Sequence, residues 1–440
     1  MSSRNLKVGL CVAWLGLAGF SAMAQPTNRT ENLIDLPTVL RLAGAQNLDV
    51  QIAQERLAEA KAQHESTAWQ FFPWLSIGAG YRRHDDLLQD VTGNIIEVHK
   101  QSYTIGPTFA AQVELGDAIY KNLAAKQLVK AADFALESQR QDSILAAAQG
   151  YFDLVKSTAL TGVVRESLKI SQDYQQQLHE GTTVGIAYKG DELRVQVQTE
   201  RYQLTLRQVL EQERISAARL AQTLHLDPVV ALVAADTDLA PVTLIETNAA
   251  LDTLVTQALR SRPELAESHA LTAAAQETKK GAVYGPLIPT VGAQAFVGGL
   301  GGGKDGSGNT FGASEDYGVG VSWRLGPGGL FDSGRRKATE ARLEITRINS
   351  AKLSDEISRQ VVEALIRVQS LYDQMLTSRT NLETSTEALR LTRARKEFGI
   401  AAVLEDIQAQ QDLTRARSDY LAIVAEYNKA QYALSWAIGK

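Results

Sequence analysis

Long stretches of this chain place apolar residues at helical spacing, without the frequent interruptions of an ordinary globular domain. Residues 118–180 contain no proline. Small and apolar side chains recur there at alternating intervals of three and four, at Leu145, Ala148, Phe152, Val155, Ala159 and Gly162. That spacing is typical of a coiled-coil seam. At about 1.5 Å per residue, the predicted helix is on the order of 90 Å long.

This helix is predicted to reverse and to pack against a shorter return helix. A break bounded by glycines covers residues 181–190, and the return helix runs over about residues 191–225. A second long helix ends near residue 397, and its return helix runs over about residues 405–438. The last helix keeps the three-four spacing throughout, at Leu413, Ala416, Tyr420, Ile423, Tyr427, Ala430, Leu434 and Ala437. The pattern predicts two long antiparallel helical hairpins.

Four shorter stretches alternate apolar residues with small or polar ones, which predicts strands with two different faces. They lie at about residues 74–81, 103–113, 291–297 and 317–325. Pro107 falls inside the second stretch. Because proline cannot donate a hydrogen bond to a ladder, we place it at a strand edge or a bend.

A shorter helix precedes each pair of strands, and a polar or glycine-rich segment lies between the two strands. The helices are predicted at about residues 36–70 and 251–283, the second of them kinked or restarted at Pro263. Residues 84–100 predict a loop or a hairpin end, and residues 298–304 predict an outward-facing loop. In each half, the shorter helix and the return helix together match the long helix in length. We therefore expect them to stack end to end along it.

The same order of elements occurs twice, at an offset of about 215 residues. The matched pairs are Leu36 with Leu251, Asp49 with Glu264, Leu115 with Leu330, and Asp117 with Asp332. A long internal duplication determines the architecture before any local motif does. We predict a first structural repeat at residues 25–228, a connector at residues 229–250 and a second structural repeat at residues 251–440.

The beginning of the chain has the features of an export signal. Arg4 and Lys7 are followed by an apolar run at residues 8–20, which is too short to span a bilayer. Ala22-Met23-Ala24 is a cleavage motif, so residues 1–24 are predicted to be a signal peptide. The single cysteine, Cys11, lies within it. The predicted mature chain therefore has no disulfide and no thiol chemistry.

Composition then excludes some classes of function. The chain has 45 Lys and Arg against 50 Asp and Glu, a net charge of −5. This balance gives no support for nucleic-acid binding. After the signal, no apolar run reaches the roughly 18 residues that a transmembrane helix needs.

Four strands per chain are too few to close a barrel alone. In lipid, the edges of an open sheet would have no hydrogen-bond partners, and about eight strands is the smallest usual barrel. Three chains would supply twelve strands, each with a lipid face and a water face. Aromatic residues could then form an interfacial belt, at Trp74, Tyr81, Tyr103, Tyr317 and Trp323. The alternative is a soluble periplasmic coiled-coil scaffold or adaptor protein with a small β-subdomain.

Taken in order, these segments resemble TolC-type outer-membrane efflux proteins, the outer membrane factor family. The likeness covers nearly all of residues 33–439. It rests on the helix openings at 36–49 and 251–265, the strand entries Phe72-Pro73-Trp74-Leu75 and Ile288-Pro289-Thr290-Val291, the strand-to-helix exit at 330–335 and the tip turn at 398–407. The resemblance implies a mainly α fold with a small β part. Long antiparallel coiled-coil hairpins and four membrane β-strands per chain would assemble into a trimeric α/β barrel.

The resemblance also implies an outer-membrane exit duct of a tripartite efflux or type I secretion system. A homotrimer would form a barrel in the outer membrane and a tunnel that extends into the periplasm. Its helical tips would bind a periplasmic adaptor protein, and through it an inner-membrane pump. The resemblance does not identify the cargo, because drugs, metal ions, solvents and polypeptides all leave through similar ducts.

The hairpin tips are the implied adaptor contact. The tip residues are Val184, Gly185, Ile186, Ala187, Phe398, Gly399, Ile400 and Ala401. A glycine there permits a tight reversal and lets another backbone approach closely.

For the periplasmic gate, the resemblance implies two acidic residues three positions apart. Glu405 occupies the first position, but Gln408 occupies the second. A ring of three Glu405 side chains would still favour cations. The missing carboxylate argues against a double ring, and Ala401 replaces an arginine sometimes found near this gate. Asp406 is close in sequence but would face about 100° away on a helix.

Other candidate sites are weaker. Residues 298–304 nearly match a phosphate-binding loop, but they lack its Ser or Thr and lead to a strand. The polar residues of the first hairpin match no metal-ligand spacing: His84, Asp85, Asp86, Glu97 and His99. A basic run near the second tip predicts a solvated helix face, with an acidic partner surface as the alternative: Arg390, Arg393, Arg395 and Lys396. We predict no enzymatic activity, no cofactor and no metal.

Overall fold

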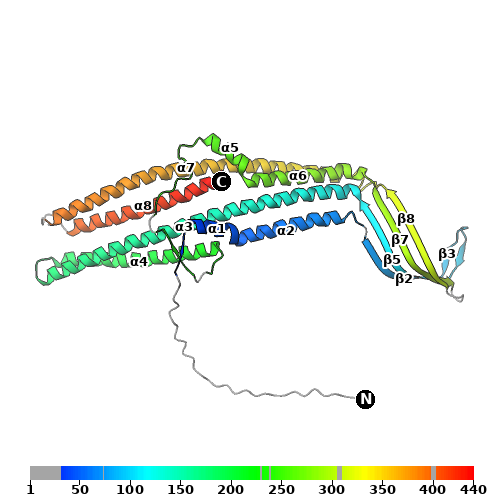
Figure 1. The fold of residues 1–440 in the computed structure, drawn as a ribbon, viewed down its shortest axis with the longest axis horizontal. Helices are drawn as coiled ribbons and strands as arrows, with labels where there is room; N and C mark the ends of the chain where they lie inside the picture. Colours follow the sequence, from blue (N-terminus) through cyan, green and yellow to red (C-terminus); the bar gives the residue numbers. More distant parts are fainter. Residues whose placement is uncertain (1–30, 73, 228–229, 237–238, 305–309, 398–402) are drawn as a thin grey trace, which may run out of the picture.

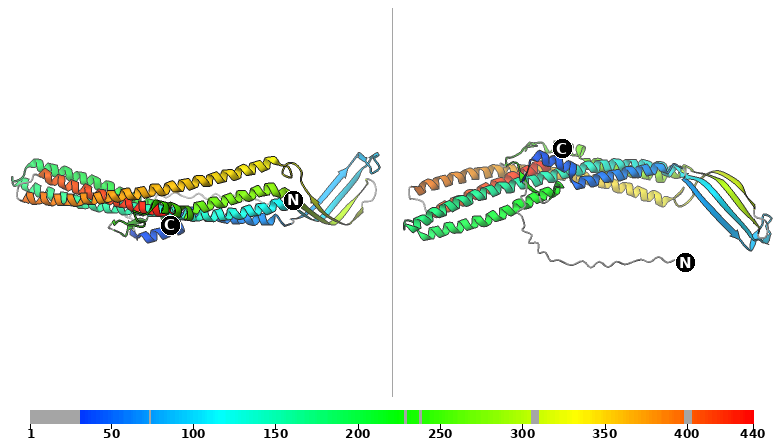
Figure 2. Two further views of the ribbon diagram at one scale, coloured as in Figure 1. Left: turned by 90° about the horizontal axis from the view of Figure 1, so that it is seen from above. Right: turned by 60° about the horizontal axis from the view of Figure 1, so that its bottom comes forward.

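The computed structural model describes residues 31–440 except 73, 228–229, 237–238, 305–309 and 398–402. The predicted signal peptide lies outside the described residues. Two very long helices run along an elongated body, α3 (Leu115–Thr183, 69 residues) and α7 (Ser333–Glu397, 65 residues). At 1.5 Å per residue each is about 100 Å long. The sheet lies at one end of this body and the helical tips lie at the other (Figures 1 and 2).

The shorter helices stack end to end along the long ones, as predicted. In the first half, α2 (Leu48–Trp69) and α4 (Lys189–Thr223) both contact α3. In the second half, α6 (Pro263–Tyr284) and α8 (Val403–Ala437) both contact α7. The corresponding helices of the two halves have equal lengths, 22 residues for α2 and α6 and 35 residues for α4 and α8. The repeat in the sequence is therefore also a repeat of structure.

The prediction of one helix over residues 36–70 was wrong, because the chain breaks at Asn47. Helix α1 (Leu36–Gln46) ends there, and Asn47 adopts a non-helical backbone with φ −59° and ψ 135°. Its side chain accepts a hydrogen bond from the Asp49 N–H at 2.8 Å and donates one to the Thr223 carbonyl at 2.8 Å. An asparagine in this role satisfies an orphan N–H at the start of a helix. It also ties α2 to the end of α4.

In the second half, proline produces the equivalent break. Helix α5 (Leu251–Ser261) ends before Pro263, which begins α6, so the predicted restart is confirmed. Arg262 at this junction pairs with Glu264 at 2.6 Å, and its guanidinium lies 4.0 Å from the centre of the Trp436 ring. The arginine is nearly fully buried, and these contacts attach the junction to the end of α8.

Four strands form one antiparallel sheet in the order β2-β5-β7-β8. They are β2 (Trp74–His84), β5 (Lys100–Glu114), β7 (Thr290–Lys304) and β8 (Thr310–Ser322). Between β2 and β5, β3 (Leu87–Gln89) pairs with β4 (Ile95–Glu97), which confirms the predicted hairpin end.

Two predictions about these strands were wrong. Residues 298–304 were expected to form a loop, but they continue β7. The prediction failed because glycines carry no side chains that could reveal an alternating pattern. Instead the rings of Tyr103 and Phe311 cover the glycine positions from the neighbouring strands. Strand β8 also begins earlier than predicted and ends at Ser322, so Trp323 and Leu325 lie beyond it.

Pro107 lies in a strand with a partner on each side, and not at an edge. It pairs in register with Ile77 of β2, whereas the ladder between β5 and β7 is interrupted at Gly106 and Pro107. A Cβ on Gly106 would lie 2.6 Å from the Val297 carbonyl oxygen. The glycine therefore lets the two strands stay close where proline cannot donate.

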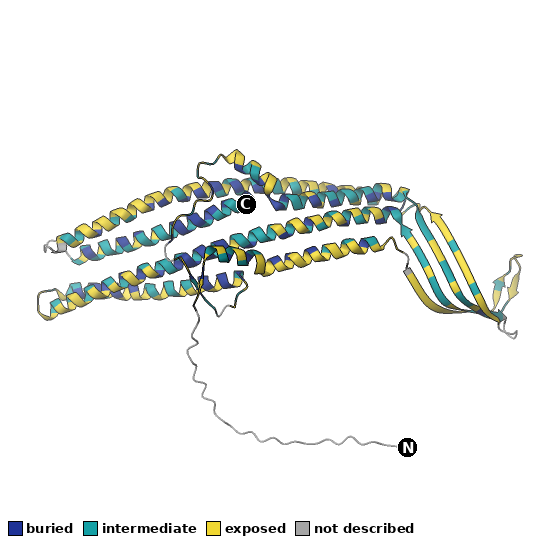
Figure 3. Cartoon of the chain, viewed as in Figure 1, coloured by how far each residue is buried: buried dark blue, intermediate teal, exposed yellow. Residues whose placement is uncertain are grey.

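The middle of the body contains the apolar core and a small element that the sequence did not reveal. Strand β1 (Glu31–Ile34) pairs in parallel with β6 (Ala231–Ala234), and β6 lies in the predicted connector. The connector is also held by Asn428, whose Oδ1 accepts from the Val242 N–H at 2.7 Å. Buried residues are concentrated in this region (Figure 3).

The predicted seam of the last helix is confirmed, and that of the first long helix is confirmed in part. Along α8, six of the eight predicted positions are buried, and Tyr420 and Ile423 are half-buried. Along α3, the predicted positions Ala148, Phe152 and Val155 are buried, Leu145 and Ala159 are half-buried, and Gly162 is exposed. Buried positions outside the predicted spacing include Tyr151, Leu154, Thr161, Val164, Ser167 and Ser171. Helix α3 contacts α4, α6 and α8, so its buried surface is wider than one seam. Among the described residues, no helix is both long enough and apolar enough to cross a bilayer.

Candidate functional site

The tip of the first hairpin is an exposed apolar turn. Gly185 has φ +79°, a conformation that favours glycine, and the Ile186 and Ala187 N–H groups both donate to the Gly181 carbonyl. The side chains beside the glycine face solvent, with Val184 70% exposed and Ile186 85% exposed. Of the residues predicted for this tip, Val184, Gly185 and Ile186 are therefore exposed, whereas Ala187 is half-buried.

A buried carboxylate anchors this tip, and sequence reasoning did not single it out. Glu192, in the first turn of α4, has a side chain only 8% exposed. It accepts hydrogen bonds from Lys189 Nζ at 2.7 Å, Thr182 Oγ1 at 2.7 Å and His179 Nδ1 at 3.0 Å. These three donors, Lys189 foremost, lower the pKa of Glu192 to about 2. The carboxylate ties the end of α3 to the start of α4.

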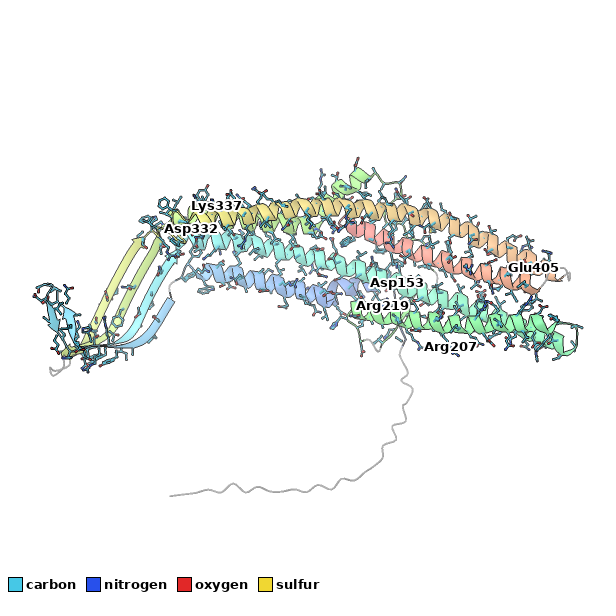
Figure 4. The ribbon with its side chains drawn as sticks, turned by 180° about the vertical axis from the view of Figure 1, so that it is seen from behind. Asp153, Arg207, Arg219, Asp332, Lys337 and Glu405 are labelled. Atoms are coloured by element: carbon cyan, nitrogen blue, oxygen red, sulfur yellow. The ribbon has the colours of Figure 1, made fainter. Side chains whose placement is uncertain are left out.

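Four residues of the second tip, Phe398, Gly399, Ile400 and Ala401, lie outside the described residues. Nearby, Glu405 is about half exposed and accepts from Arg395 Nη1 at 3.3 Å. Gln408 is exposed one turn further along α8. Glu405 is therefore paired with an arginine of α7, which the sequence did not predict. Figure 4 shows Glu405 near the helical tips.

The three arginines of the basic run on α7 each have a partner. Arg390 binds Glu387 at 2.7 Å. Arg393 donates to Gln410 at 3.0 Å and lies 3.9 Å from Asp406. Asp406 is buried, in agreement with its predicted orientation away from Glu405.

A cavity separates the two hairpins near their tips. Its volume is about 530 Å³, and residues of α3, α4, α7 and α8 line it, among them Tyr174, Tyr202, Arg393 and Asp406. Polar contacts join the hairpins around it: Ser167 with Thr414 at 2.9 Å, Arg417 with Glu166 at 2.9 Å, and Gln411 with Gln198. Near the tips, the two hairpins are therefore joined by polar contacts that water can replace.

At the other end of the body, the two faces of the sheet differ sharply. One face is mostly small or polar, including Ser76, Gly78, Gly80, Thr104, Thr108, Gln294, Ser314 and Asp316, and it also carries Phe296 and Leu300 of β7. The other face is mostly apolar or aromatic, including Leu75, Ile77, Tyr81, Tyr103, Phe109, Ala295, Tyr317 and Val319, with Arg83 and Glu315 as charged exceptions. This alternation is what a strand between lipid and water requires.

The expected aromatic belt is divided between two levels. Tyr81 pairs in register with Tyr103 near the end of the sheet that lies far from the helices. Tyr103 stacks on Phe311, with ring centres 6.0 Å apart. Trp323 lies at the helical end, where its Nε1 donates to the Leu287 carbonyl at 3.2 Å. Residues of this kind at both ends of an apolar band suit two membrane interfaces.

The junction between strands and long helices is fixed by the aspartates that the repeat had matched. Asp332 accepts from the backbone N–H groups of Arg335 and Gly328, each at 2.8 Å, and these bonds lower its pKa. Arg335 also pairs with Asp117 at the start of α3, at 2.8 Å. Arg335 therefore links the matched positions Asp117 and Asp332. Figure 4 shows Asp332 where the sheet joins the helices.

The weaker candidate sites have structural explanations. His99 Nδ1 lies 3.0 Å from Asp85, which also accepts from Arg83 at 2.7 Å. The described part of the chain holds no group of three or more His, Cys, Asp or Glu residues arranged to bind a metal ion. The segment that resembled a phosphate-binding loop belongs to β7.

Comparison with known proteins agrees with this architecture. A family model described as outer membrane efflux protein matches residues 39–224 and 254–440. A search of curated proteins found no match.

Solved structures share the fold over most of the chain. The outer-membrane channel OprN is 19% identical, with 92% of this chain and 89% of that chain covered and a TM-score of 0.73. The Campylobacter jejuni CmeC outer membrane channel is 16% identical, with 92% and 85% covered and a TM-score of 0.76. The Neisseria gonorrhoeae MtrE outer membrane channel, solved in an open state, is 15% identical, with 92% and 88% covered and a TM-score of 0.72.

Proposed function

This chain belongs to the outer membrane efflux protein family, and from that premise we propose that three copies of it form an exit duct from the periplasm to the exterior. As a member of that family it is an outer membrane protein, with its helical body in the periplasm. The assembly into three, the partners and the cargo belong to the proposal.

The observation that carries the proposal is that the sheet is open. Among the described residues, β2 and β8 each pair on one side only. Their outer N–H and C=O groups need partners in a bilayer, where water is absent and an unpaired group costs several kcal/mol. Because β2 and β8 run antiparallel to one another, β8 of one copy can continue the same antiparallel sheet with β2 of the next.

Closure also explains the two faces of the sheet. Wrapped into a barrel, the apolar face meets lipid and the small, polar face lines a water-filled passage. Two copies would supply eight strands and three would supply twelve. The resemblance to TolC-type proteins favours three. The helical hairpins would then continue the passage as a tunnel.

The exposed first tip supports contact with a periplasmic adaptor. Val184 and Ile186 present apolar surface at the extreme end of the body, where an isolated chain gains nothing from it. Glu192 holds the turn in shape beneath them. Phe398, Gly399, Ile400 and Ala401 are proposed to complete the contact. An adaptor bound there would link the duct to an inner-membrane pump.

The gate is proposed to lie near Glu405 and Gln408. The cavity of about 530 Å³ and the polar contacts around it support hairpins that separate at the tips. One of the similar channels is described as an open state. The cargo is expected to be selected by the pump, so this chain alone does not specify it.

Reconstitution tests the proposal. The purified protein should migrate as a heat-modifiable trimer on gels and should produce stepwise currents in a planar lipid bilayer. A chain extracted from the periplasm as a soluble monomer, with no conductance in bilayers, would overturn the duct and favour the periplasmic scaffold.

A further inference from the structure

Two large apolar side chains lie on the otherwise small and polar face of the sheet. Phe296 of β7 pairs in register with Thr108 of β5, and Leu300 pairs with Thr104. Both lie on the face that is proposed to line the passage, because side chains two residues apart along a strand share a face. Leu300 is 46% exposed. Apolar surface on a water-facing wall stabilises nothing until another apolar surface covers it.

Glycines beside these residues leave a hollow in the polar face. Its volume is about 570 Å³, and residues of all four strands line it, among them Gly78, Gly80, Phe296 and Leu300. A Cβ on Gly78 would meet nothing within 4 Å. Small-molecule sites usually have volumes of about 300–1,000 Å³. The hollow is therefore large enough for a small organic molecule.

The ring of Phe296 lies over two glycines where the ladder between β5 and β7 is interrupted. A Cβ on Gly106 would lie 3.3 Å from Phe296 Cε2, and a Cβ on Gly298 would lie 2.8 Å from Phe296 Cζ. Packing on these glycines fixes the position of the ring, and the ring also lines the hollow. This packing explains neither the exposure of Leu300 nor the carboxylate beside the ring.

That carboxylate belongs to Asp316 of β8, which pairs in register with Phe296. The Cβ atoms of directly opposite residues in an antiparallel pair are about 4.5–5.5 Å apart. Asp316 is exposed, and in the described part of the chain its side chain has no ion-pair or hydrogen-bond partner. The hollow thus combines an aromatic ring, an aliphatic side chain and a negative charge.

The cations of the same face lie too far away within the chain to neutralise Asp316. The strand pairings place Asp316 level with Ser76. Arg82 lies six residues further along β2, about 20 Å away at 3.3 Å per residue. Screening in physiological salt acts over about 8 Å. At the helical end of the sheet, Arg324 is already paired with Glu114 at 3.1 Å.

We infer that the hollow binds an amphipathic organic cation, with Phe296 and Leu300 against its apolar body and Asp316 beside its charge. The face of an aromatic ring attracts cations, and the carboxylate adds to this attraction. Asp316 would repel an anion, and a metal ion would gain nothing from the two apolar side chains. The inference rests on the proposed function, because the hollow borders a passage only in the closed barrel.

The experiment uses the full-length protein in a planar bilayer at about 0.1 M salt, with rhodamine 6G as the probe. This aromatic cation should block the current reversibly at micromolar to millimolar concentration. Fluorescein has a similar ring system but is an anion at neutral pH, so it should block at least about tenfold more weakly. Tetramethylammonium, a cation without an apolar body, should not block at the same concentration.

Variants locate the block at the hollow. Asp316→Asn removes the charge at nearly constant shape, and Phe296→Leu removes the ring. Each should weaken the block by about five- to tenfold, whereas Phe296→Tyr should retain it. The matched controls lie on the other face of the same strands, and Glu315→Gln and Phe109→Leu should stay within about twofold of wild type. The unblocked conductance of each variant shows that the duct has assembled.

The possible failures can be distinguished. Stepwise conductance with a block that Asp316→Asn and Phe296→Leu both leave unchanged would overturn the site and leave the duct intact. Equal block by rhodamine 6G and fluorescein, or equal weakening by Glu315→Gln, would show that Asp316 does not select the ligand, and it also overturns the site. Absence of conductance from the wild-type protein would overturn the proposed function, and the site with it.

Discussion

The same helices are packed in two different ways at the middle of the body and at the tips. In the middle, fully buried apolar side chains fill the space between the hairpins, among them Tyr151, Leu154, Leu220 and Leu434. Near the tips, a cavity of about 530 Å³ lies between the hairpins, and hydroxyl, amide and ion-pair contacts surround it.

The energetic consequences of these two kinds of packing differ. Each large apolar side chain buried in the middle contributes about 1.5–3 kcal/mol. A hydrogen bond at the tips contributes only about 0.5–1.5 kcal/mol, because water replaces it when the groups separate. The middle therefore fixes the hairpins relative to one another, and the tips can separate at lower cost.

The largest expected effect comes from removing apolar volume in the middle. Leu220→Ala deletes a fully buried side chain of α4 and should lower the free energy of unfolding by about 2–5 kcal/mol. Thermal unfolding of the detergent-solubilised protein, followed by circular dichroism, measures this loss. Leu204→Ala, at a position of the same helix that is 59% exposed, should cost less than about 1 kcal/mol. Equal losses would contradict the apolar core.

The next effect concerns the buried carboxylate beneath the first tip. Glu192→Gln should increase hydrogen exchange of the turn amides of Gly185 and Ile186. The folded-state pKa of about 2 lies below the unfolded value of about 4.3. The stabilisation by the carboxylate is therefore complete above the unfolded value and is lost as the pH falls through about 2. The variant and wild type should differ by a constant factor above pH 5 and converge toward pH 2.

Glu200 supplies the control for this pH dependence. It is an exposed carboxylate on the same helix, bonded only to Gln196 among its described contacts. Glu200→Gln should leave exchange at the turn unchanged. A difference at Glu192 that persists undiminished at pH 2 would show that the carboxylate charge is not responsible.

Substitution of the tip glycine, Gly185, is expected to have a smaller effect on stability but to impair efflux. A bulky residue such as valine at Gly185 must adopt φ near +79°, which costs about 1–2 kcal/mol for a residue with a Cβ. It would also stand where a partner is proposed to approach. Gly185→Val should reduce dye efflux from cells while trimers still form.

Gly162→Ala is the matched control for the tip. This glycine lies within α3, is exposed, and a Cβ there would meet nothing within 4 Å. Its substitution should leave efflux unchanged and should stabilise the helix by about 0.5–1 kcal/mol. Normal efflux by Gly185→Val at wild-type protein levels would count against docking at the tip.

The smallest effect is expected at the proposed gate. Glu405→Ala should weaken the cation preference of the channel, but only modestly, because Arg395 already pairs with the carboxylate. Arg395→Gln should strengthen the preference. Neither change should alter stability by more than about 1 kcal/mol, as is usual for exposed ion pairs. Reversal potentials in a salt gradient measure both, and an unchanged potential in both variants would exclude Glu405 from the gate.

Much of the fold could be predicted because periodic patterns extend over many residues. Three such features can be read directly from the order of residues along the chain. They are the uninterrupted spacing in α8, the restart at Pro263 and the constant offset between the two halves. The break at Asn47 could not be predicted from the sequence. The asparagine is held there by a hydrogen bond to the Thr223 carbonyl, which is far away in the sequence. Strand β7 was shortened in the prediction because glycines do not alternate visibly.

The sites were less predictable than the fold. The turn at Gly185 could be located from its glycine, but the role of Glu192 depends on donors from two helices. The pairing of Glu405 with Arg395 joins residues of two different helices, α8 and α7. The acidic pattern of the sequence was visible, but the neutralising partner was not. The inter-hairpin cavity likewise arises only when four helices are brought together.

The open sheet can be tested directly with introduced cysteines, because the predicted mature chain has none of its own. Within one chain, β2 and β8 are separated by two intervening strands, about 14 Å at 4.8 Å per step. A disulfide cannot span that distance, so any bond between the two edges must join different copies. Ser76→Cys would be combined in turn with Ser314→Cys, Gly318→Cys and Ser322→Cys. We predict that oxidation of at least one pair in intact outer membranes yields covalent trimers, and monomers from every pair would contradict closure by identical neighbours.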